Sequence, residues 1–317
     1  MHLHIISPLD PKEFINSHIA SYRLRLSYVF KAAIQLGYKV TGNLSVPRNA
    51  DFYYIGKLTK NMDQKKITEI IQNLDKKKPS IFIDYTDDLL EAKNIEQKKV
   101  YEKLMSINSI AIVPVNGLGE KLKKIGKKFF VIPDGIDNIS ERHPHLHNNR
   151  IKNVLWTGHS SNIDSLLRII SKDLVKYKFN LHMVSNQRFF EIFKNTKFNI
   201  TPKCNPTGYL WNINKLKDVS KKCDFAILPT DKIWASANRL ITAFRLGLPV
   251  IAETISSYKE YSDYYCNFDQ DSVQNMFNFP ENWHQSVIIA QKKYTLFIES
   301  KKNFIYSFIF TKLIIFL

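Results

Sequence analysis

The chain has 317 residues, with 46 Lys and Arg against 29 Asp and Glu and a formal net charge of +17. This length is more than one hydrophobic core usually supports, so we expect two domains. A hydrophobic fraction of 44% with 13% aromatic residues excludes general disorder. The positive charge favours a polyanionic neighbour, which is nucleic acid, an anionic membrane surface or a phosphorylated substrate.

The lysines are spread along the chain in short runs such as Lys65–Lys66 and Lys127–Lys128. The sequence has no recognition helix, zinc finger or aromatic RNA-binding strand, so we expect no nucleic-acid partner. Three cysteines, at positions 204, 223 and 266, lack the spacing of a metal site, which favours reduced thiols and no structural metal. The start MHLHIISPLD lacks the pattern of a signal peptide, so we expect a cytoplasmic protein.

Strand and helix patterns alternate through the first part of the chain. The expected helices cover Ile19–Leu36, which stops at Gly37, and Gln64–Leu74. The expected strands are His2–Ser7, Tyr38–Val40, Asp51–Ile55, Ser80–Ile83, Ser109–Pro114 and Phe129–Ile132. This order predicts a doubly wound parallel sheet. Gly117 and Gly119 lack the third glycine of a dinucleotide-binding loop, so we expect no nicotinamide cofactor.

Basic residues gather early in the first long helix, where the sequence HIASYRLR contains His18, Arg23 and Arg25. The alternation with leucine predicts that one arginine points away from the core while the other turns toward the strand ends. Cations at the carboxyl edge of a parallel sheet face a bound ligand. The alternative is two surface arginines on an amphipathic helix.

Acidic residues follow the strand Ser80–Ile83, in the sequence DYTDD. Asp84, Asp87 and Asp88 could hold a sugar hydroxyl, act as a base or bind a divalent metal. They could equally begin a helix, because acidic side chains favour the first helical turn.

A turn and a polar segment separate the two halves of the chain. The turn is PDGID, and the polar segment is ERHPHLHNNR, which lacks any hydrophobic period. We therefore expect a first domain over residues 1–138, a linker over 139–150, a second domain over 151–290 and an apolar tail over 291–317. Three histidines lie in the linker, and we expect no metal there. They are His143, His145 and His147.

The second domain repeats the α/β pattern. Its expected strands are Asn153–Trp156, Leu181–Val184, Phe198–Thr201, Phe225–Leu228 and Val250–Ala252. One expected helix, Ile213–Lys221, precedes the fourth of these strands. Another joins the last two strands and ends at a turn that contains Gly247 and Pro249. A strand, a helix and a further strand in that order predict a right-handed parallel unit.

Two loops of this domain are candidate phosphate sites, because each leads from a strand into a helix N-terminus. The first contains Gly158, His159, Ser160, Ser161 and Asn162. The alternative role of Ser161 is a capping box with Asp164. The second loop ends in Ser236, Ala237, Asn238 and Arg239. Ser236 is a candidate N-cap, and Arg239 adds a fork of permanently charged donors.

Five motifs, in this order, resemble those of the GT-B glycosyltransferases, in particular the glycogen-synthase-like group (group 1) of bacterial polysaccharide assembly. They are R-x-R before G-Y-K-V, I-P-D-G-I-D, V-L-W-T-G, C-D-F-A-I-L-P, and S-A-N-R-L-I-T-A-F-R-L-G-L-P-V-I-A. The resemblance covers about residues 1–270. It implies an α/β protein with the GT-B fold, in which two doubly wound Rossmann-like domains face each other across a cleft.

The resemblance also implies an activity. The second domain would hold a nucleotide-sugar donor, and the first a saccharide or lipid-linked acceptor. Gly158 to Ser160 would contact the diphosphate or the sugar, while Ser236, Asn238 and Arg239 would contact the diphosphate and ribose. Members of this group usually need no metal, because cations and helix ends neutralise the leaving diphosphate. We therefore expect no cofactor, and the nucleotide-diphosphate sugar is a substrate.

One departure from the family pattern concerns the donor. Many members carry two glutamates eight positions apart where this chain has Trp234 and Thr242. Neither residue is a carboxylate, so the donor or the transferred group can differ, and the alternatives are a polyol-phosphate transferase or a nucleotide-sugar epimerase on the same fold. A retaining enzyme needs no protein nucleophile, whereas an inverting one needs a base such as His18, Asp87 or Asp88.

The chain ends in the apolar sequence FIYSFIFTKLIIFL, Phe304–Leu317. This segment is short for a bilayer span. It either packs on the first domain, inserts into an anionic membrane surface with help from the basic charge, or is an altered natural end. The second alternative would place the protein peripherally on the inner face of the plasma membrane, next to a lipid-linked acceptor.

Overall fold

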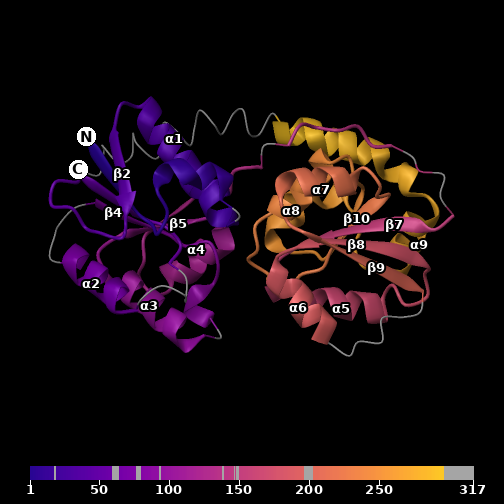
Figure 1. Cartoon of the computed structure of the whole chain (residues 1–317), viewed down its shortest axis with the longest axis horizontal. Helices are drawn as coiled ribbons and strands as arrows, with labels where there is room; N and C mark the ends of the chain where they lie inside the picture. The colour runs from indigo at the N-terminus through magenta and orange to yellow at the C-terminus, as the bar shows by residue number, and fades with distance from the viewer. Residues whose placement is uncertain are drawn as a thin grey trace. The chain divides into compact units, whose positions relative to one another are not determined.

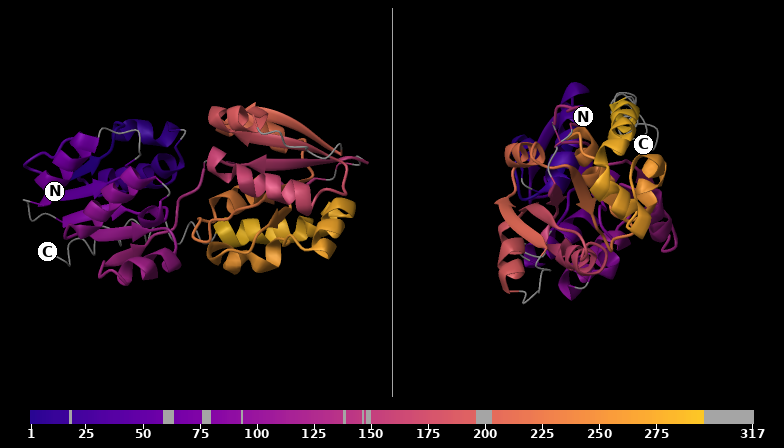
Figure 2. Two further views of the ribbon diagram at one scale, coloured as in Figure 1. Left: turned by 90° about the horizontal axis from the view of Figure 1, so that it is seen from below. Right: turned by 90° about the vertical axis from the view of Figure 1, so that its right-hand side faces the viewer.

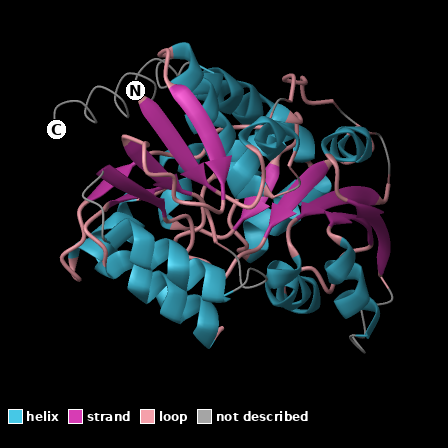
Figure 3. Ribbon diagram, turned by 60° about the vertical axis from the view of Figure 1, so that its left-hand side comes forward, coloured by secondary structure: helices cyan, strands magenta, loops and turns pink. Residues whose placement is uncertain are grey.

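The computed structural model describes residues 1–17, 19–58, 64–75, 80–92, 94–137, 139–145, 147, 150–195 and 203–295. These residues form two compact units, the first from Met1 to Gly135 and the second from Ile136 onward (Figure 1). The colours in Figure 2 show that each unit is built from one continuous part of the described chain. Figure 3 shows helices on both sides of the strands in each unit.

The first unit contains a six-stranded parallel sheet in the order β2-β1-β3-β4-β5-β6. Its strands are β1 (His2–Ile6), β2 (Lys39–Asn43), β3 (Phe52–Ile55), β4 (Ser80–Asp84), β5 (Ile110–Val113) and β6 (Phe129–Val131). Its helices are α1 (Ser27–Gln35), α2 (Gln64–Asp75), α3 (Ile95–Ser106) and α4 (Asn116–Lys123). Each strand overlaps one that the sequence predicts, whereas α3 has no counterpart among the expected helices.

Helices cover both faces of this sheet, which is why β1 and β3 are buried at every position. Helix α1 packs on one face, against Leu3, Ile5 and Phe52, and α2 and α3 lie on the other (Figure 1). The expected helix Ile19–Leu36 is divided, because a π-helical turn, η2 (Tyr22–Leu26), precedes α1. π-turns of this kind often occur at functional positions.

The second unit contains a five-stranded parallel sheet in the order β11-β10-β7-β8-β9. Its strands are β7 (Lys152–Thr157), β8 (Phe179–Ser185), β9 (Cys204–Leu210), β10 (Phe225–Leu228) and β11 (Val250–Ala252). Its helices are α5 (Ile163–Lys172), α6 (Gln187–Asn195), α7 (Ile213–Ser220), α8 (Asn238–Arg245) and α9 (Gln270–Asn278), and residues 284–295 are also largely helical. The expected strand Phe198–Thr201 lies outside the described residues, and β9 was not expected.

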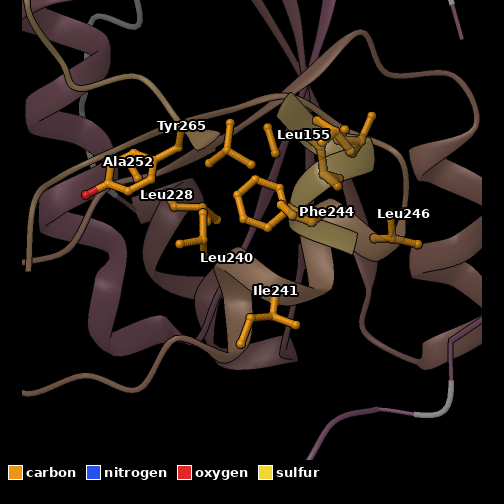
Figure 4. Close-up of a cluster of buried hydrophobic side chains, with 14 of the residues drawn as sticks. Leu155, Leu228, Leu240, Ile241, Phe244, Leu246, Ala252 and Tyr265 are labelled. Atoms are coloured by element: carbon orange, nitrogen blue, oxygen red, sulfur yellow. The ribbon is translucent and has the colours of Figure 1, made fainter. Parts of the chain in front are cut away.

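A cluster of buried apolar side chains holds α8 and α7 on one face of this sheet. Phe244 of α8 lies in the middle of the cluster, between Leu155 of β7 and Leu228 of β10 (Figure 4). A second cluster joins α5, α6 and α9 to the opposite face. Burial of Phe244 therefore fixes where α8 begins, two residues after Ser236 in the turn before it.

The described part of the polar segment 139–150 packs on the second unit. Ile139 belongs to the apolar cluster around α8. The Arg142 amide donates to the Arg245 carbonyl at 2.9 Å, and its guanidinium donates to the Ser220 carbonyl at 3.0 Å. Gly247 approaches this segment so closely that an added Cβ would lie 2.6 Å from the Arg142 carbonyl oxygen, and its φ is +74°. Both the close contact and the positive φ therefore exclude a side chain at position 247.

The described residues lack two features. No helix among them is long and apolar enough to cross a bilayer, and the apolar segment Phe304–Leu317 lies outside them. No group of three or more His, Cys, Asp or Glu side chains in the same residues is arranged to hold a metal ion.

Candidate functional site

The carboxyl edge of the second sheet has a point where the chain connections diverge. From β7 the chain continues to β8 and β9 on one side, whereas β10 and β11 lie on the other side of β7. Ligands of open α/β sheets bind at such a point, beyond the carboxyl ends of the two adjacent strands. The loops that follow β7 and β10 are the two that the sequence predicts as phosphate sites.

The loop after β7 is held tightly by its neighbours. An added Cβ on Gly158 would lie 2.6 Å from the buried Trp156 ring, so only glycine fits there. The Gly158 carbonyl accepts a hydrogen bond from the Ser185 hydroxyl at 2.7 Å, and the Ser160 amide donates to the Asn186 side chain at 3.1 Å. Asn186, which sequence reasoning missed, thus fixes the loop from the end of β8.

The same loop enters α5 through a 3₁₀ turn, Ser160–Asn162. The Ser161 amide donates to the His159 ring nitrogen Nδ1 at 3.2 Å. Asn162 occupies the N-cap of α5 and makes no side-chain capping hydrogen bond. The capping box expected between Ser161 and Asp164 is therefore wrong, because the 3₁₀ turn moves the helix start to Ile163.

The loop after β10 is organised by carboxylates. Glu253, directly after β11, accepts hydrogen bonds from the Thr230 amide and from Arg168. Asp231 accepts from the Ser165 hydroxyl at 2.6 Å and from Arg168 at 3.2 Å. These two acids fix the loop from both sides. Neither was a predicted site residue, although Glu253 follows the last apolar strand of the motif directly.

Lys232 links the two loops. Its Nζ lies 3.4 Å from the Ser161 hydroxyl, so the loop after β10 reaches across to the loop after β7. The structure therefore brings the two predicted phosphate loops together. Between Gly158 and Ser165 the sequence contains no Lys or Arg, so this lysine adds a positive charge that the first loop lacks.

Helix α8 begins at Asn238, with Ala237 at its N-cap. Ser236, the predicted N-cap, therefore lies one residue before the observed one, and its hydroxyl accepts a hydrogen bond from the Asn238 amide at 3.2 Å. Trp234 and Asn238 are half-buried, whereas Thr242, one turn into the helix, is buried. The positive end of the helix dipole therefore lies at Asn238 and Arg239.

Arg239 stands in the first turn of α8. Its Nη1 atom is buried and makes no hydrogen bond among the described residues. The guanidinium lies beside the Tyr258 hydroxyl. Burial raises the pKa of Tyr258, and the charge of Arg239 opposes that rise. A buried donor without an acceptor is costly, and an anionic ligand would supply one.

The predicted residues of the first unit include a buried ionic cluster at the end of β4. Arg25 Nε donates to Asp84 at 2.6 Å, and Arg25 Nη1 donates to Asp134 at 2.7 Å. Asp84 is fully buried and also accepts from the Tyr54 hydroxyl at 3.1 Å. Burial lowers the pKa of Arg25, but Asp84 and Asp134 together raise it above its ordinary value. Arg25 is therefore charged and internally paired.

The other predicted residues of this unit lie nearer the surface. Asp87 pairs with Lys57, and Asp88 pairs with Lys121. Arg23 is half-buried and donates to the Ser17 carbonyl at 2.7 Å. His18 lies outside the described residues. Of the residues expected to bind the acceptor, Arg25 and Asp84 thus form an ion pair, and Asp87 and Asp88 lie in the loop that follows β4.

No protein-family model and no curated protein matches the chain. Solved structures with the GT-B fold do match it over nearly its whole length. Together with the two parallel α/β units, this match shows that the chain has the GT-B fold, as the sequence predicts.

The neighbours include Anabaena Alr3699/HepE in complex with UDP-glucose, with a TM-score of 0.62 and 13% identity over 98% of this chain and 100% of that one. Another is trehalose-6-phosphate synthase OtsA, with a TM-score of 0.57 and 9% identity over 99% of each chain. An E. coli structure described as trehalose-6-phosphate, bound with UDP-2-fluoro glucose, has a TM-score of 0.52 and 8% identity over 95% of this chain and 99% of that one.

Proposed function

We propose that this protein is a glycosyltransferase that moves a sugar from a nucleotide-diphosphate donor to an acceptor. The proposal is supported by the GT-B fold, which the chain shares with structures solved with UDP-glucose and UDP-2-fluoro glucose. It is supported equally by the carboxyl edge of the second sheet, where two loops and a helix start meet at the point predicted for ligands.

Arg239 carries the proposal. A buried guanidinium nitrogen without a hydrogen bond among the described residues, at the start of a helix, suits the negative charge of a diphosphate. When the bond between the sugar and the diphosphate breaks, charge develops on the leaving phosphate. Arg239 and the α8 dipole would neutralise that charge, which is why we assign no metal to the reaction.

The neighbouring residues complete the donor site. The loop Gly158–Ser160 would contact the diphosphate or the sugar through the hydroxyls of Ser160 and Ser161, because the Gly158 and Ser160 amides already donate to Val184 and Asn186. Lys232, at 3.4 Å from Ser161, would add charge beside them. Ser236 and Asn238 would face the diphosphate and ribose. We assign His159 and Asn162 to the same loop, and Trp234 and Thr242 to the place where related enzymes carry glutamates.

The first unit would bind the acceptor. His18, Arg23, Asp87 and Asp88 are assigned to that side, with the two acids or the histidine as bases if the reaction inverts configuration. Arg25 and Asp84 are buried and bonded to each other, so we assign them to holding the loop that carries Asp87 and Asp88.

We place the reaction in cell-surface polysaccharide synthesis, with a saccharide or lipid-linked acceptor. The net charge of +17 supports contact with an anionic membrane surface during that reaction. Flotation with anionic liposomes, compared with neutral ones, tests the membrane contact. Failure to float with anionic liposomes at low salt would argue against it.

A screen of thermal stability tests the donor proposal. A ligand that binds only the folded protein raises its Tm. We expect one of UDP, GDP, CDP, ADP or their sugar conjugates to raise the Tm clearly, and Arg239→Ala to abolish the rise. A folded sample that responds to none of them contradicts the proposal.

A second candidate function follows from Trp234 and Thr242, which replace the two family glutamates. The protein could transfer a polyol phosphate or epimerise a nucleotide sugar on the same fold. Product analysis separates these activities from glycosyl transfer. An epimerase converts the nucleotide sugar without an acceptor, and a polyol-phosphate transferase adds phosphorus to the product.

A further inference from the structure

A segment outside the recognised motifs contacts the loop after β10. The 3₁₀ helix η5 (Ser256–Tyr264) follows β11, and its first two side chains turn back toward the loop. The Ser256 hydroxyl donates to the Ile233 carbonyl at 3.0 Å, and the Ser257 hydroxyl donates to the Ala235 carbonyl at 2.6 Å. Two consecutive serines therefore hold two carbonyls of the loop that leads into α8.

The next residue, Tyr258, extends this contact to Arg239. Its side chain is fully buried, and its ring lies edge-on to Tyr265 with centroids 6.0 Å apart. The hydroxyl lies beside the Arg239 guanidinium, yet neither this hydroxyl nor Arg239 Nη1 completes a hydrogen bond of good geometry within the described residues. Two adjacent buried polar groups are thus left incomplete at one place.

Incomplete buried groups of this kind need an explanation, because a buried polar group that stays unpaired destabilises the fold. A ligand that draws the guanidinium into a fully bonded position would provide one. A guanidinium has five N–H donors in a planar fork. One can be given to the Tyr258 hydroxyl while others bind an anion.

We propose that Ser256, Ser257 and Tyr258 form a brace that positions Arg239 and the loop 233–238 for a bound diphosphate. This inference rests on the proposed function of the same site. The serines hold the Ile233 and Ala235 carbonyl oxygens, which are then unavailable to turn toward the anion and repel it. Tyr258 limits the directions in which Arg239 can point. The three residues are positioning residues and need not touch the ligand.

The brace can be removed one hydroxyl at a time. Tyr258→Phe and Ser257→Ala each delete one hydroxyl and leave the packing intact. Tyr261→Phe is the matched control for tyrosine, because Tyr261 belongs to the same 3₁₀ helix but its hydroxyl is directed to Glu260. Ser171→Ala is the control for serine, since its hydroxyl donates to the Leu167 carbonyl within α5.

Two measurements are made on the full chain. The first is the Kd of whichever of UDP, GDP, CDP and ADP binds the wild type, by titration calorimetry. The second is amide hydrogen exchange over residues 233–239 without ligand. For both brace variants we expect Kd to rise about fivefold to tenfold, as loss of one ordinary intramolecular hydrogen bond predicts. Exchange over 233–239 should also become faster, with both controls unchanged.

Each other outcome is decisive. Unchanged Kd in both brace variants overturns the positioning role, whether or not exchange becomes faster. Equal increases in Kd for the brace variants and their controls overturn it as well. If the wild type binds none of the four nucleotides, the proposed function fails, and inorganic pyrophosphate becomes the probe. The brace then stands only if pyrophosphate binds the wild type and binds Tyr258→Phe more weakly.

Discussion

Arg25 in the first unit and Arg239 in the second both lie near the carboxyl edge of a parallel sheet, but their surroundings differ. Arg25 is bonded to Asp84 and Asp134 and to the Ile132 carbonyl. Arg239 has no carboxylate among its hydrogen-bond partners in the described residues, and its Nη1 has no partner there. The first arginine is saturated in the sense that two carboxylates of the protein pair with it, although Asp84 Oδ2 is buried without a hydrogen bond in the described residues. The second arginine retains donor capacity.

This difference separates two uses of a buried charge. A saturated cluster stabilises local structure, because removal of one partner leaves the other charge buried and alone. An unsaturated arginine costs stability until a ligand completes it, and this makes it suitable for binding. Arg25→Ala and Arg239→Ala test this contrast directly, and smaller effects are expected from the close packing of Gly158 and the burial of Lys127.

Arg25→Ala should destabilise the first unit by about 3–5 kcal/mol, because it leaves Asp84 buried without its cation. All four tryptophans, at positions 156, 211, 234 and 283, lie in the second unit. Urea unfolding followed by circular dichroism should therefore shift, while the tryptophan fluorescence transition should not. Arg23→Ala is the control, and we expect a smaller loss of about 1 kcal/mol, because its Nη1 donates to the neutral Ser17 carbonyl and not to a buried carboxylate. An Arg25 effect no larger than the control would contradict the saturated cluster.

Arg239→Ala should have the opposite profile, with little loss of stability and a large loss of function. We expect transition-state stabilisation to fall by about 2–4 kcal/mol, as for removal of one oxyanion donor. This corresponds to a fall in kcat/KM of roughly 30-fold to 1,000-fold. Lys215→Ala removes an exposed charge from α7 and serves as the control. A turnover within threefold of the wild type would remove Arg239 from the reaction.

Gly158→Ala should destabilise the second unit by about 1–3 kcal/mol, which is typical of overpacking. The new Cβ would lie 2.6 Å from the Trp156 ring, and this ring is fixed by stacking on Phe189 at 4.6 Å. The tryptophan fluorescence transition reports the change. In a Trp156→Phe background the same alanine should cost less, since the contacted ring atom is absent. An identical cost in both backgrounds would place the cause elsewhere.

The smallest expected effect is a change with pH in the contribution of Lys127 to the unfolding free energy. Burial lowers its pKa from 10.5 to about 8, and its Nζ donates to the carbonyls of Met105 and Ile107. Between pH 8 and 10.5 the unfolded state binds more protons than the folded state, so stability rises with pH. Between pH 8 and 10, the unfolding free energy of the wild type relative to Lys127→Met should rise by about 1–2 kcal/mol. A difference that stays flat would show that Lys127 is not desolvated.

Much of the fold could be predicted from the residues alone. Five of the six strands of the first sheet and most strands of the second are short apolar runs bounded by turns, and such runs are local patterns. The start of α8 was similarly visible in S-A-N-R. Helix α3 was missed because its lysines and glutamates weaken the apolar period, and β9 was missed because most of its residues are exposed.

The partners of the charged residues could not be predicted in this way. Arg25 meets Asp84 across 59 positions of sequence and Asp134 across 109. The Ser256 and Ser257 hydroxyls reach back across 23 and 22 positions. Sequence patterns reveal which side chains have the right chemistry, but a hydrogen bond depends on distances set by the packing of separate elements. The residues therefore predicted two parallel α/β units and indicated an anion site at the start of α8. Packing alone paired Arg25 with two carboxylates and left Arg239 Nη1 without a partner in the described residues.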